Sequence, residues 1–139
     1  MTLEEIHTVS EIDFMEANIA LKSNGIVYVL FKDHCVLDID LQLKLLDAYN
    51  EITDFKKTPF MFFAGENVTI TKEARDNATN LEDKSPLSAT AIIISNLAYK
   101  LIAEFFIKFN KPKRPYKIFK NEKEAVEWLK QFESIDNKN

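Results

Sequence analysis

Short apolar runs that alternate with stretches of helical periodicity limit most strongly how this chain can fold. The runs at 59–64, 91–95 and 116–119 have the length and the apolar content of strands in a sheet. Between and after these runs, apolar residues recur at three- and four-residue spacing, as on one face of a helix. Strands that alternate with helices along a chain build an α/β domain whose later strands run parallel.

A hairpin is predicted ahead of these strand–helix units. Ser23-Asn24-Gly25 separates residues 17–22, where polar and apolar residues alternate, from residues 26–31, which are apolar on both faces. Asn-Gly between two such runs is the strongest short-range signal for a hairpin turn. The alternation also predicts that 17–22 has one wet face and that 26–31 lies nearer the centre of the sheet.

The helical patterns predict about four helices. The first follows Asp40, a suitable N-cap residue, although apolar residues between 37 and 43 also alternate with period two and leave its start open. The second, 72–81, is mostly polar and is expected to be the most exposed. The third, 97–109, is strongly apolar, and the fourth begins after Asn121 with an amphipathic face.

Length and composition indicate one domain over residues 1–139, with an ordered core from about 14 to 133. The single cysteine, Cys35, excludes an internal disulfide and is typical of a reducing compartment. No apolar run reaches the roughly 18 residues of a membrane span, and the acidic N-terminus has no apolar signal-peptide region. We therefore expect a cytoplasmic protein with no transmembrane segment.

The net charge of −4 disfavours nucleic acid as a partner, because nucleic-acid binding requires a basic surface. The charge is unevenly spread, since residues 99–120 hold seven basic residues and one acid. A solvated helix face followed by a basic loop is one interpretation of this segment. A local patch for an anion or a phospholipid headgroup is the other.

The sequence contains no recognisable motif for a catalytic, metal or cofactor site. His34 and Cys35 are adjacent, so on a strand they would point to opposite faces, and Asp-His-Cys is not a zinc spacing. Two isolated glycines cannot form a phosphate-binding loop, and the nucleophile-elbow and zinc-protease motifs are missing. The sequence predicts a protein that is not an enzyme and that binds no cofactor or metal.

The C-terminal third carries a family resemblance. Its parts are Ala91-Ile92-Ile93-Ile94-Ser95, residues 101–106, Asn110-Lys111-Pro112, Ile118-Phe119, and the helix start Glu124-Ala125-Val126-Glu127-Trp128-Leu129. In these features the chain resembles the STAS family (sulfate transporter and anti-sigma factor antagonist), in its SpoIIAA-like branch of small stand-alone bacterial proteins. The resemblance implies a mixed β-sheet, with an N-terminal hairpin and then parallel strands, flanked by about four helices. It also implies a non-catalytic protein-interaction or regulatory module.

The resemblance further implies a phosphorylation switch. Anti-sigma antagonists of this family are phosphorylated on a serine at the start of the helix after the third strand, within an Asp-Ser-Ser-Gly-like stretch. Residues 66–71 lack this stretch, and Thr69 and Thr71 are the nearest hydroxyls. Both are candidate phosphorylation sites, whereas the simpler interpretation of Thr71 is that it caps the helix 72–81.

The expected helix 97–109 has more apolar residues than one buried face needs. The surplus can pack on the last helix through Trp128 and Phe132, form a homodimer interface, or line a surface for a lipid or other apolar ligand. In the last case the basic turn that follows would suit an anionic headgroup. The residues of this candidate interface or ligand surface are Phe105, Phe106, Phe109, Lys111, Lys113 and Arg114.

Overall fold

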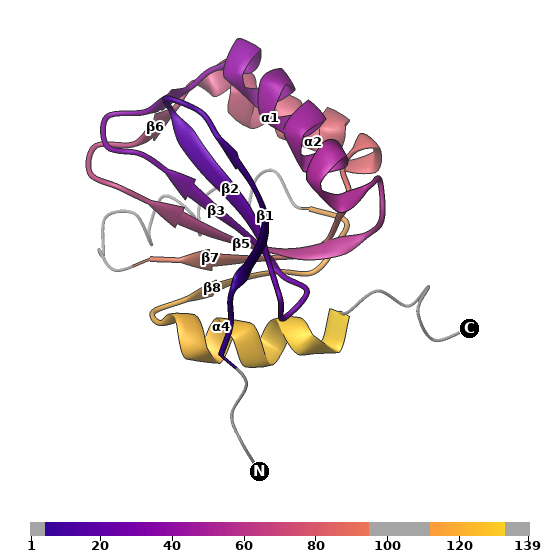
Figure 1. The fold of residues 1–139 in the computed structure, drawn as a ribbon. Helices are drawn as coiled ribbons and strands as arrows, with labels where there is room; N and C mark the ends of the chain where they lie inside the picture. The colour runs from indigo at the N-terminus through magenta and orange to yellow at the C-terminus, as the bar shows by residue number, and fades with distance from the viewer. Residues whose placement is uncertain (1–4, 95–111, 133–139) are drawn as a thin grey trace.

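A six-stranded mixed sheet forms the centre of the computed structural model, which describes residues 5–94 and 112–132 (Figure 1). Its strands are β1 (Thr8–Asp13), β2 (Ala17–Lys22), β3 (Val27–Phe31), β5 (Thr58–Ala64), β7 (Leu87–Ile93) and β8 (Tyr116–Phe119). Neighbouring strands follow the order β1-β2-β3-β5-β7-β8. The β1–β2 and β2–β3 pairs are antiparallel, and the β3–β5, β5–β7 and β7–β8 pairs are parallel.

Helices cover both faces of this sheet. Helices α1 (Ile39–Thr53) and α2 (Lys72–Leu81) lie together on one side, and α4 (Glu122–Leu129) lies on the other (Figure 1). Residues 5–94 and 112–132 thus contain three α-helices where the sequence predicts about four, and the predicted helix 97–109 lies outside these residues. None of the described helices is both long and apolar enough to cross a membrane.

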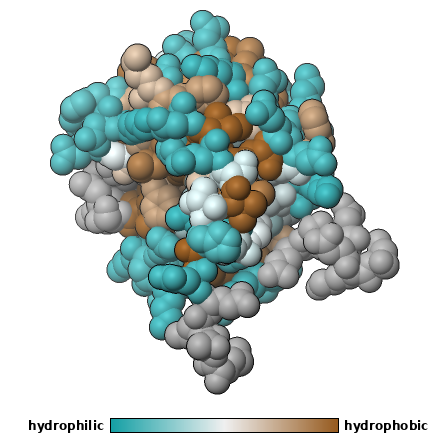
Figure 2. Space-filling model, viewed as in Figure 1, coloured by the Kyte–Doolittle hydropathy of each residue, from teal (hydrophilic) through white to brown (hydrophobic). Residues whose placement is uncertain are grey.

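Two apolar cores result, because successive strand residues point to opposite faces of the sheet. Val27, Val29 and Phe60 are buried on the side of α1, together with helix residues such as Leu45. The second core lies under α4 and is built from the alternate strand positions. Its buried members are Ile26, Tyr28, Met61, Ala89, Ala91, Phe119, Ala125 and Leu129. Figure 2 shows hydrophilic side chains over much of the surface in view, with apolar ones in small groups between them.

The predicted hairpin is confirmed. Gly25 takes the left-handed backbone conformation, with φ of 81°, and its N–H donates to the carbonyl of Lys22 at 2.9 Å. Strand β3 pairs with β2 on one side and with β5 on the other, so it is an interior strand as the sequence predicts. Glycine is favoured at this turn because it adopts positive φ at no steric cost.

Three strands of this sheet differ from the prediction. Strand β2 lies between β1 and β3 and has no exposed residue, so the wet face predicted for residues 17–22 is wrong. Strand β1 lies ahead of residue 14, where the ordered core was expected to begin, and it pairs with β2 at the edge of the sheet. Nearly all residues of β1 are exposed, on both faces of the strand. Its sequence therefore does not alternate between apolar and polar residues. Strand β7 starts at Leu87 rather than at residue 91, because Ser88 and Thr90 interrupt the apolar pattern while their backbone stays in the strand.

The helix caps are mostly as predicted. Thr71 caps α2 by accepting a hydrogen bond from the N–H of Ala74, and Asn121 caps α4 in the same way. The expectation for α1 is wrong: Asp38, and not Asp40, accepts from the N–H of Leu41 at 2.9 Å. Asp40 lies in the first turn, where its charge favours the helix N-terminus.

The loops after β3 and β5 approach each other closely at the carboxyl ends of these strands. A short parallel pair, β4 (Val36–Leu37) and β6 (Thr69–Ile70), continues them. Asp33 Oδ1 accepts a hydrogen bond from the N–H of Glu66 at 2.8 Å, and Gly65 lies directly against Asp33. A Cβ on Gly65 would overlap this carboxylate and would lie 2.9 Å from the backbone nitrogen of Asp33.

We therefore predict that Gly65→Ala destabilises the fold by about 2 kcal/mol, as overpacking at a backbone contact typically does. Chemical denaturation measures this change. Gly25→Ala is the control, because its Cβ meets nothing within 4 Å and only its left-handed backbone is strained, which costs about 1 kcal/mol. A Gly65→Ala variant as stable as the wild type would contradict the close approach of the two loops.

Candidate functional site

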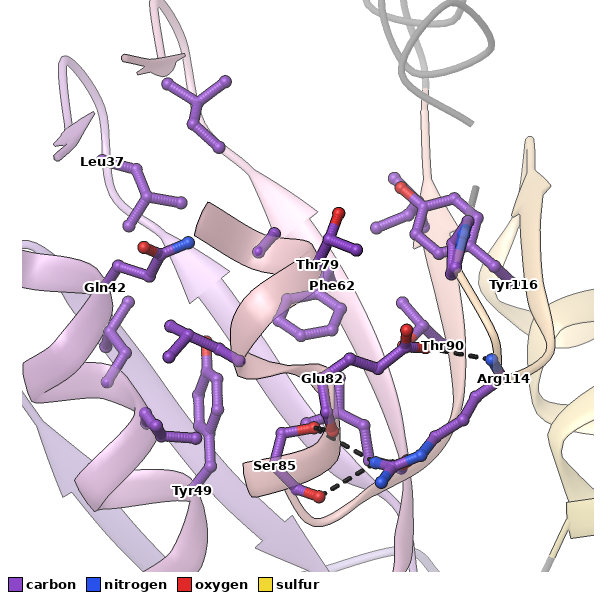
Figure 3. A pocket seen from close by; sticks show the side chains of 18 of the residues that line it. Leu37, Gln42, Tyr49, Phe62, Thr79, Glu82, Ser85, Thr90, Arg114 and Tyr116 are labelled. Atoms are coloured by element: carbon purple, nitrogen blue, oxygen red, sulfur yellow. Dashed lines mark hydrogen bonds between the residues drawn. The ribbon is translucent and has the colours of Figure 1, made fainter. Parts of the chain in front are cut away.

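A cavity of about 290 Å³ lies between helices α1 and α2 and the sheet. The sheet provides its floor, and the helices and the chain before β8 provide its walls (Figure 3). Most of the surrounding side chains are aliphatic or aromatic. The floor consists of Phe31, Phe62, Leu87, Thr90, Ile92 and Tyr116, and the α1 wall consists of Gln42, Leu45, Leu46 and Tyr49.

Helix α2 leaves this space open because its side chains toward the sheet are small. Ala74 is the one buried residue among its ten. Ala78 and Leu81, the thin apolar stripe of this polar helix, line the cavity together with Thr79. An alanine at the centre of the stripe does not reach the sheet, so volume remains between the two layers.

Hydrogen bonds, rather than a broad apolar face, attach α2 to α1. The side chain of Gln42 on α1 donates from Nε2 to the carbonyl of Ala74 at 2.7 Å. Its Oε1 accepts from Nδ2 of Asn77 at 3.1 Å. Both ends of one amide therefore bind α2 along the edge of the cavity.

A second set of hydrogen bonds joins the end of α2 to the segment before β8. Glu82, at the start of the 3₁₀ turn η1 (Glu82–Lys84), accepts from the backbone N–H groups of Lys113 and Arg114, each at 2.9 Å. In return, Nη1 of Arg114 donates to the carbonyls of Ser85 at 2.9 Å and Leu87 at 2.6 Å (Figure 3). These bonds fix one end of the cavity.

The structure describes two of the six residues of the predicted interface or ligand surface. Lys113 is exposed, and its Nζ lies 3.3 Å from Oδ2 of Asp83. Arg114 lines the cavity and makes the bonds given above. A role of these cations toward an anionic headgroup stays a prediction. The other four, Phe105, Phe106, Phe109 and Lys111, lie outside the described residues.

Two tyrosines that line the cavity, Tyr49 and Tyr116, have pKa values raised by burial. Burial raises the pKa of Tyr49 above its ordinary value, and the ring of this residue packs edge-on against Phe60 at a centroid distance of 5.0 Å. Burial also raises the pKa of Tyr116 to about 12. Both raised pKa values reflect burial, which solvates the charged phenolate poorly.

The predicted phosphorylation sites lie outside the cavity lining, at the other end of α2. The hydroxyl of Thr71 accepts the N–H of Ala74 at 3.1 Å, and Thr69 is exposed in β6. Asp38, Asp40, Thr71 and Glu73 line a shallow surface pocket. A phosphate on Thr71 would be favoured by the helix N-terminus and opposed by the like charges of these acids. Phosphorylation at either threonine stays a prediction.

His34 and Cys35 do not share a site. His34 is exposed in the left-handed conformation, and its Nδ1 lies 3.2 Å from Nδ2 of Asn67. Cys35 is buried, and burial together with nearby Glu16 and Asp38 raises the pKa of its thiol. Within residues 5–94 and 112–132, no group of three or more His, Cys, Asp or Glu side chains is arranged to hold a metal ion.

The cavity itself was not predicted from the sequence. Gln42, Glu82 and Tyr116 come from three separate parts of the chain and belong to no motif. One signal was available: the helix 72–81 has an apolar stripe too small to fill the space beneath it. A polar helix with alanine where a large apolar residue would close the gap indicates a space above the sheet.

We predict that Glu82→Gln loosens the segment before β8, because a glutamine offers one acceptor oxygen to two backbone donors. Amide hydrogen exchange at Lys113 and Arg114 should accelerate about tenfold, corresponding to about 1.4 kcal/mol for the lost charged hydrogen bond. Asp83→Asn is the matched control, since it removes an exposed ion pair worth at most about 1 kcal/mol. Unchanged exchange in Glu82→Gln would show that Glu82 does not hold this segment.

Comparison with known proteins agrees with the fold. No curated protein matches the chain. The crystal structure of an uncharacterised DUF3478-family protein with a SpoIIAA-like fold, from Shewanella loihica PV-4, matches with a TM-score of 0.54 at 14% identity. The match covers 93% of this chain and 97% of that one, which confirms the predicted SpoIIAA-like fold. A family model described as a domain of unknown function, DUF7793, matches residues 19–133, and the chain therefore belongs to that family.

Proposed function

We propose that this protein is a non-catalytic binding module that takes a small, mainly apolar molecule into the cavity under α2. The observation that carries the proposal is the cavity of about 290 Å³ with its largely aliphatic and aromatic lining. Ligand sites are typically concave and mainly apolar, with a few polar groups that orient the ligand. Binding without catalysis, in the cytoplasm, is the role that this proposal assigns to the fold.

The volume limits the ligand to a small molecule. It lies near the lower end of the roughly 300–1,000 Å³ range of ligand pockets. It is about twice the volume of an engineered apolar cavity of roughly 150 Å³ that binds benzene. A molecule of about two fused rings, or an aliphatic one of similar volume, fits this space.

The neutral bicyclic compound 1-naphthol is a suitable probe. We expect it to bind at sub-millimolar concentration and to shift the methyl NMR signals of Leu46, Ala78 and Ile92, which line the cavity. The methyl signals of Ala91 and Leu129, in the core under α4, should not move. No shift at the cavity methyls up to the solubility limit of the probe would refute the proposed function.

Filling the cavity provides the second half of this test. Ala78→Leu places a larger apolar side chain into the space beneath α2 and should weaken 1-naphthol binding at least tenfold. Asn80→Leu is the matched control, because Asn80 is exposed on the same helix and does not line the cavity. Equal binding by both variants, at unchanged melting temperatures, would place the probe elsewhere.

Self-association is a second candidate, favoured by the loops at the carboxyl ends of β3 and β5. Met15 is 90% exposed and Val36 is 53% exposed. The turn that holds Met15 contacts the end of β3, where the N–H of Lys32 donates to the carbonyl of Glu16. His34 and Asn67 hold left-handed backbones in the same loops, a strain that is often found at functional sites. A second copy of the chain is the partner that we assign to this surface.

Light scattering tests the second candidate. The wild type should be a dimer at about 100 µM, and Met15→Glu combined with Val36→Glu should be a monomer, because each acid would be desolvated at the interface. Leu43→Glu, on the exposed face of α1, is the control and should leave the dimer intact. A monomeric wild type would contradict self-association through these loops.

A further inference from the structure

The polar groups around the cavity are largely engaged by the protein itself. The amide of Gln42 uses both of its ends to bind α2, as described above. The hydroxyl of Ser85 donates to the carbonyl of Glu82 at 2.9 Å and accepts from Nη1 of Arg114 at 3.2 Å. A ligand that took these groups would have to break bonds that hold α2 and η1 in place.

The carboxylate of Glu82 and Nη1 of Arg114 are engaged in the same way. The carboxylate receives the backbone N–H groups of Lys113 and Arg114, and Nη1 donates to the backbone carbonyls of Ser85 and Leu87. Figure 3 shows the bonds that join Arg114 to Glu82 and Ser85. The opposite charges of Glu82 and Arg114 lie at the same end of the cavity, so the part of the lining that the structure describes has no net charge. A ligand carboxylate here would meet Glu82 as well as Arg114, and desolvating an ion without a dedicated partner is costly.

Three hydroxyls remain for a ligand. Among the residues that the structure describes, the side chains of Tyr49, Thr79 and Thr90 make no hydrogen bond, although all three line the cavity. Thr79 lies at the exposed rim on α2, and Thr90 lies on the floor in β7. A hydroxyl can donate or accept one bond, which suits a neutral polar group on the ligand.

We infer that the ligand of this cavity is an uncharged molecule of about two rings, with a hydroxyl or carbonyl group that meets Tyr49, Thr79 or Thr90. This inference rests on the proposed function and names its ligand class. It differs from the anionic headgroup that the basic turn suggests in the sequence, because in the structure Glu82 binds the backbone of Lys113 and the guanidinium of Arg114 binds a backbone carbonyl. The raised pKa values of the two tyrosines agree with a site that disfavours charge.

A matched pair of probes tests the charge of the ligand. At pH 7, 1-naphthol is neutral, whereas 1-naphthoate has the same rings and carries a carboxylate. Isothermal titration with the full chain should give a dissociation constant at least tenfold lower for 1-naphthol. Equal or tighter binding of 1-naphthoate would overturn the inference and leave the proposed function standing. Binding of neither probe would refute the proposed function and the inference with it.

Removal of the hydroxyls tests the polar group. Tyr49→Phe combined with Thr79→Val and Thr90→Val keeps the shape of the three side chains and should weaken 1-naphthol binding about three- to tenfold, the usual effect of one lost hydrogen bond. Thr8→Val, on β1 at the opposite edge of the sheet, should leave binding unchanged. Unchanged affinity in the triple variant would overturn the assignment of these hydroxyls to the ligand.

Discussion

Hydrogen bonds at its two ends hold helix α2 above the sheet, and the cavity depends on them. Gln42 ties the start of α2 to α1, and Glu82 ties its end to the backbone before β8. A helix attached by apolar packing would settle onto the sheet until its side chains filled the gap, because interiors approach close packing. Here the polar attachments set the height of the helix, and Ala78 is too short to fill the space.

The two faces of the sheet differ for this reason. On the face of α4, Trp128 packs between Phe119 and Phe132 at centroid distances of 5.6 and 4.9 Å. Ala125 and Leu129 are fully buried beneath it. That face is closed by large apolar side chains, as expected for a purely structural layer. The face of α1 and α2 also has a mainly apolar floor, but the polar and weakly buried helix α2 lies above it.

The fold was largely predictable because its signals are local. Asn24-Gly25 marks the hairpin, and the apolar run at 59–64 marks the central strand β5. Thr71 and Asn121 mark helix starts through their own side chains. Strand β1 is not predicted from the sequence, because both of its faces are mainly exposed and its residues show no apolar alternation. As an edge strand it is held by backbone pairing with β2. Asp38 and Asp40 are chemically equivalent as caps, so only the structure decides between them.

The candidate site was not predictable, because it arises between elements far apart in the chain. Glu82 and Arg114 are 32 positions apart, and neither residue alone signals a contact. For Lys111, Lys113 and Arg114 the sequence leaves a solvated basic loop and an anion-binding patch both open, since composition shows charges but not their partners. In the structure, Asp83 and Glu82 lie beside Lys113 and Arg114, and anion binding there stays a prediction.

The central claim is that an apolar cavity exists between α2 and the sheet in the folded protein. A crystal of the full chain under xenon pressure tests this directly, because xenon occupies dry apolar cavities. We predict anomalous density for xenon among Leu46, Phe62 and Ile92. Density in this space that belongs to protein side chains, with no bound xenon, would contradict the account.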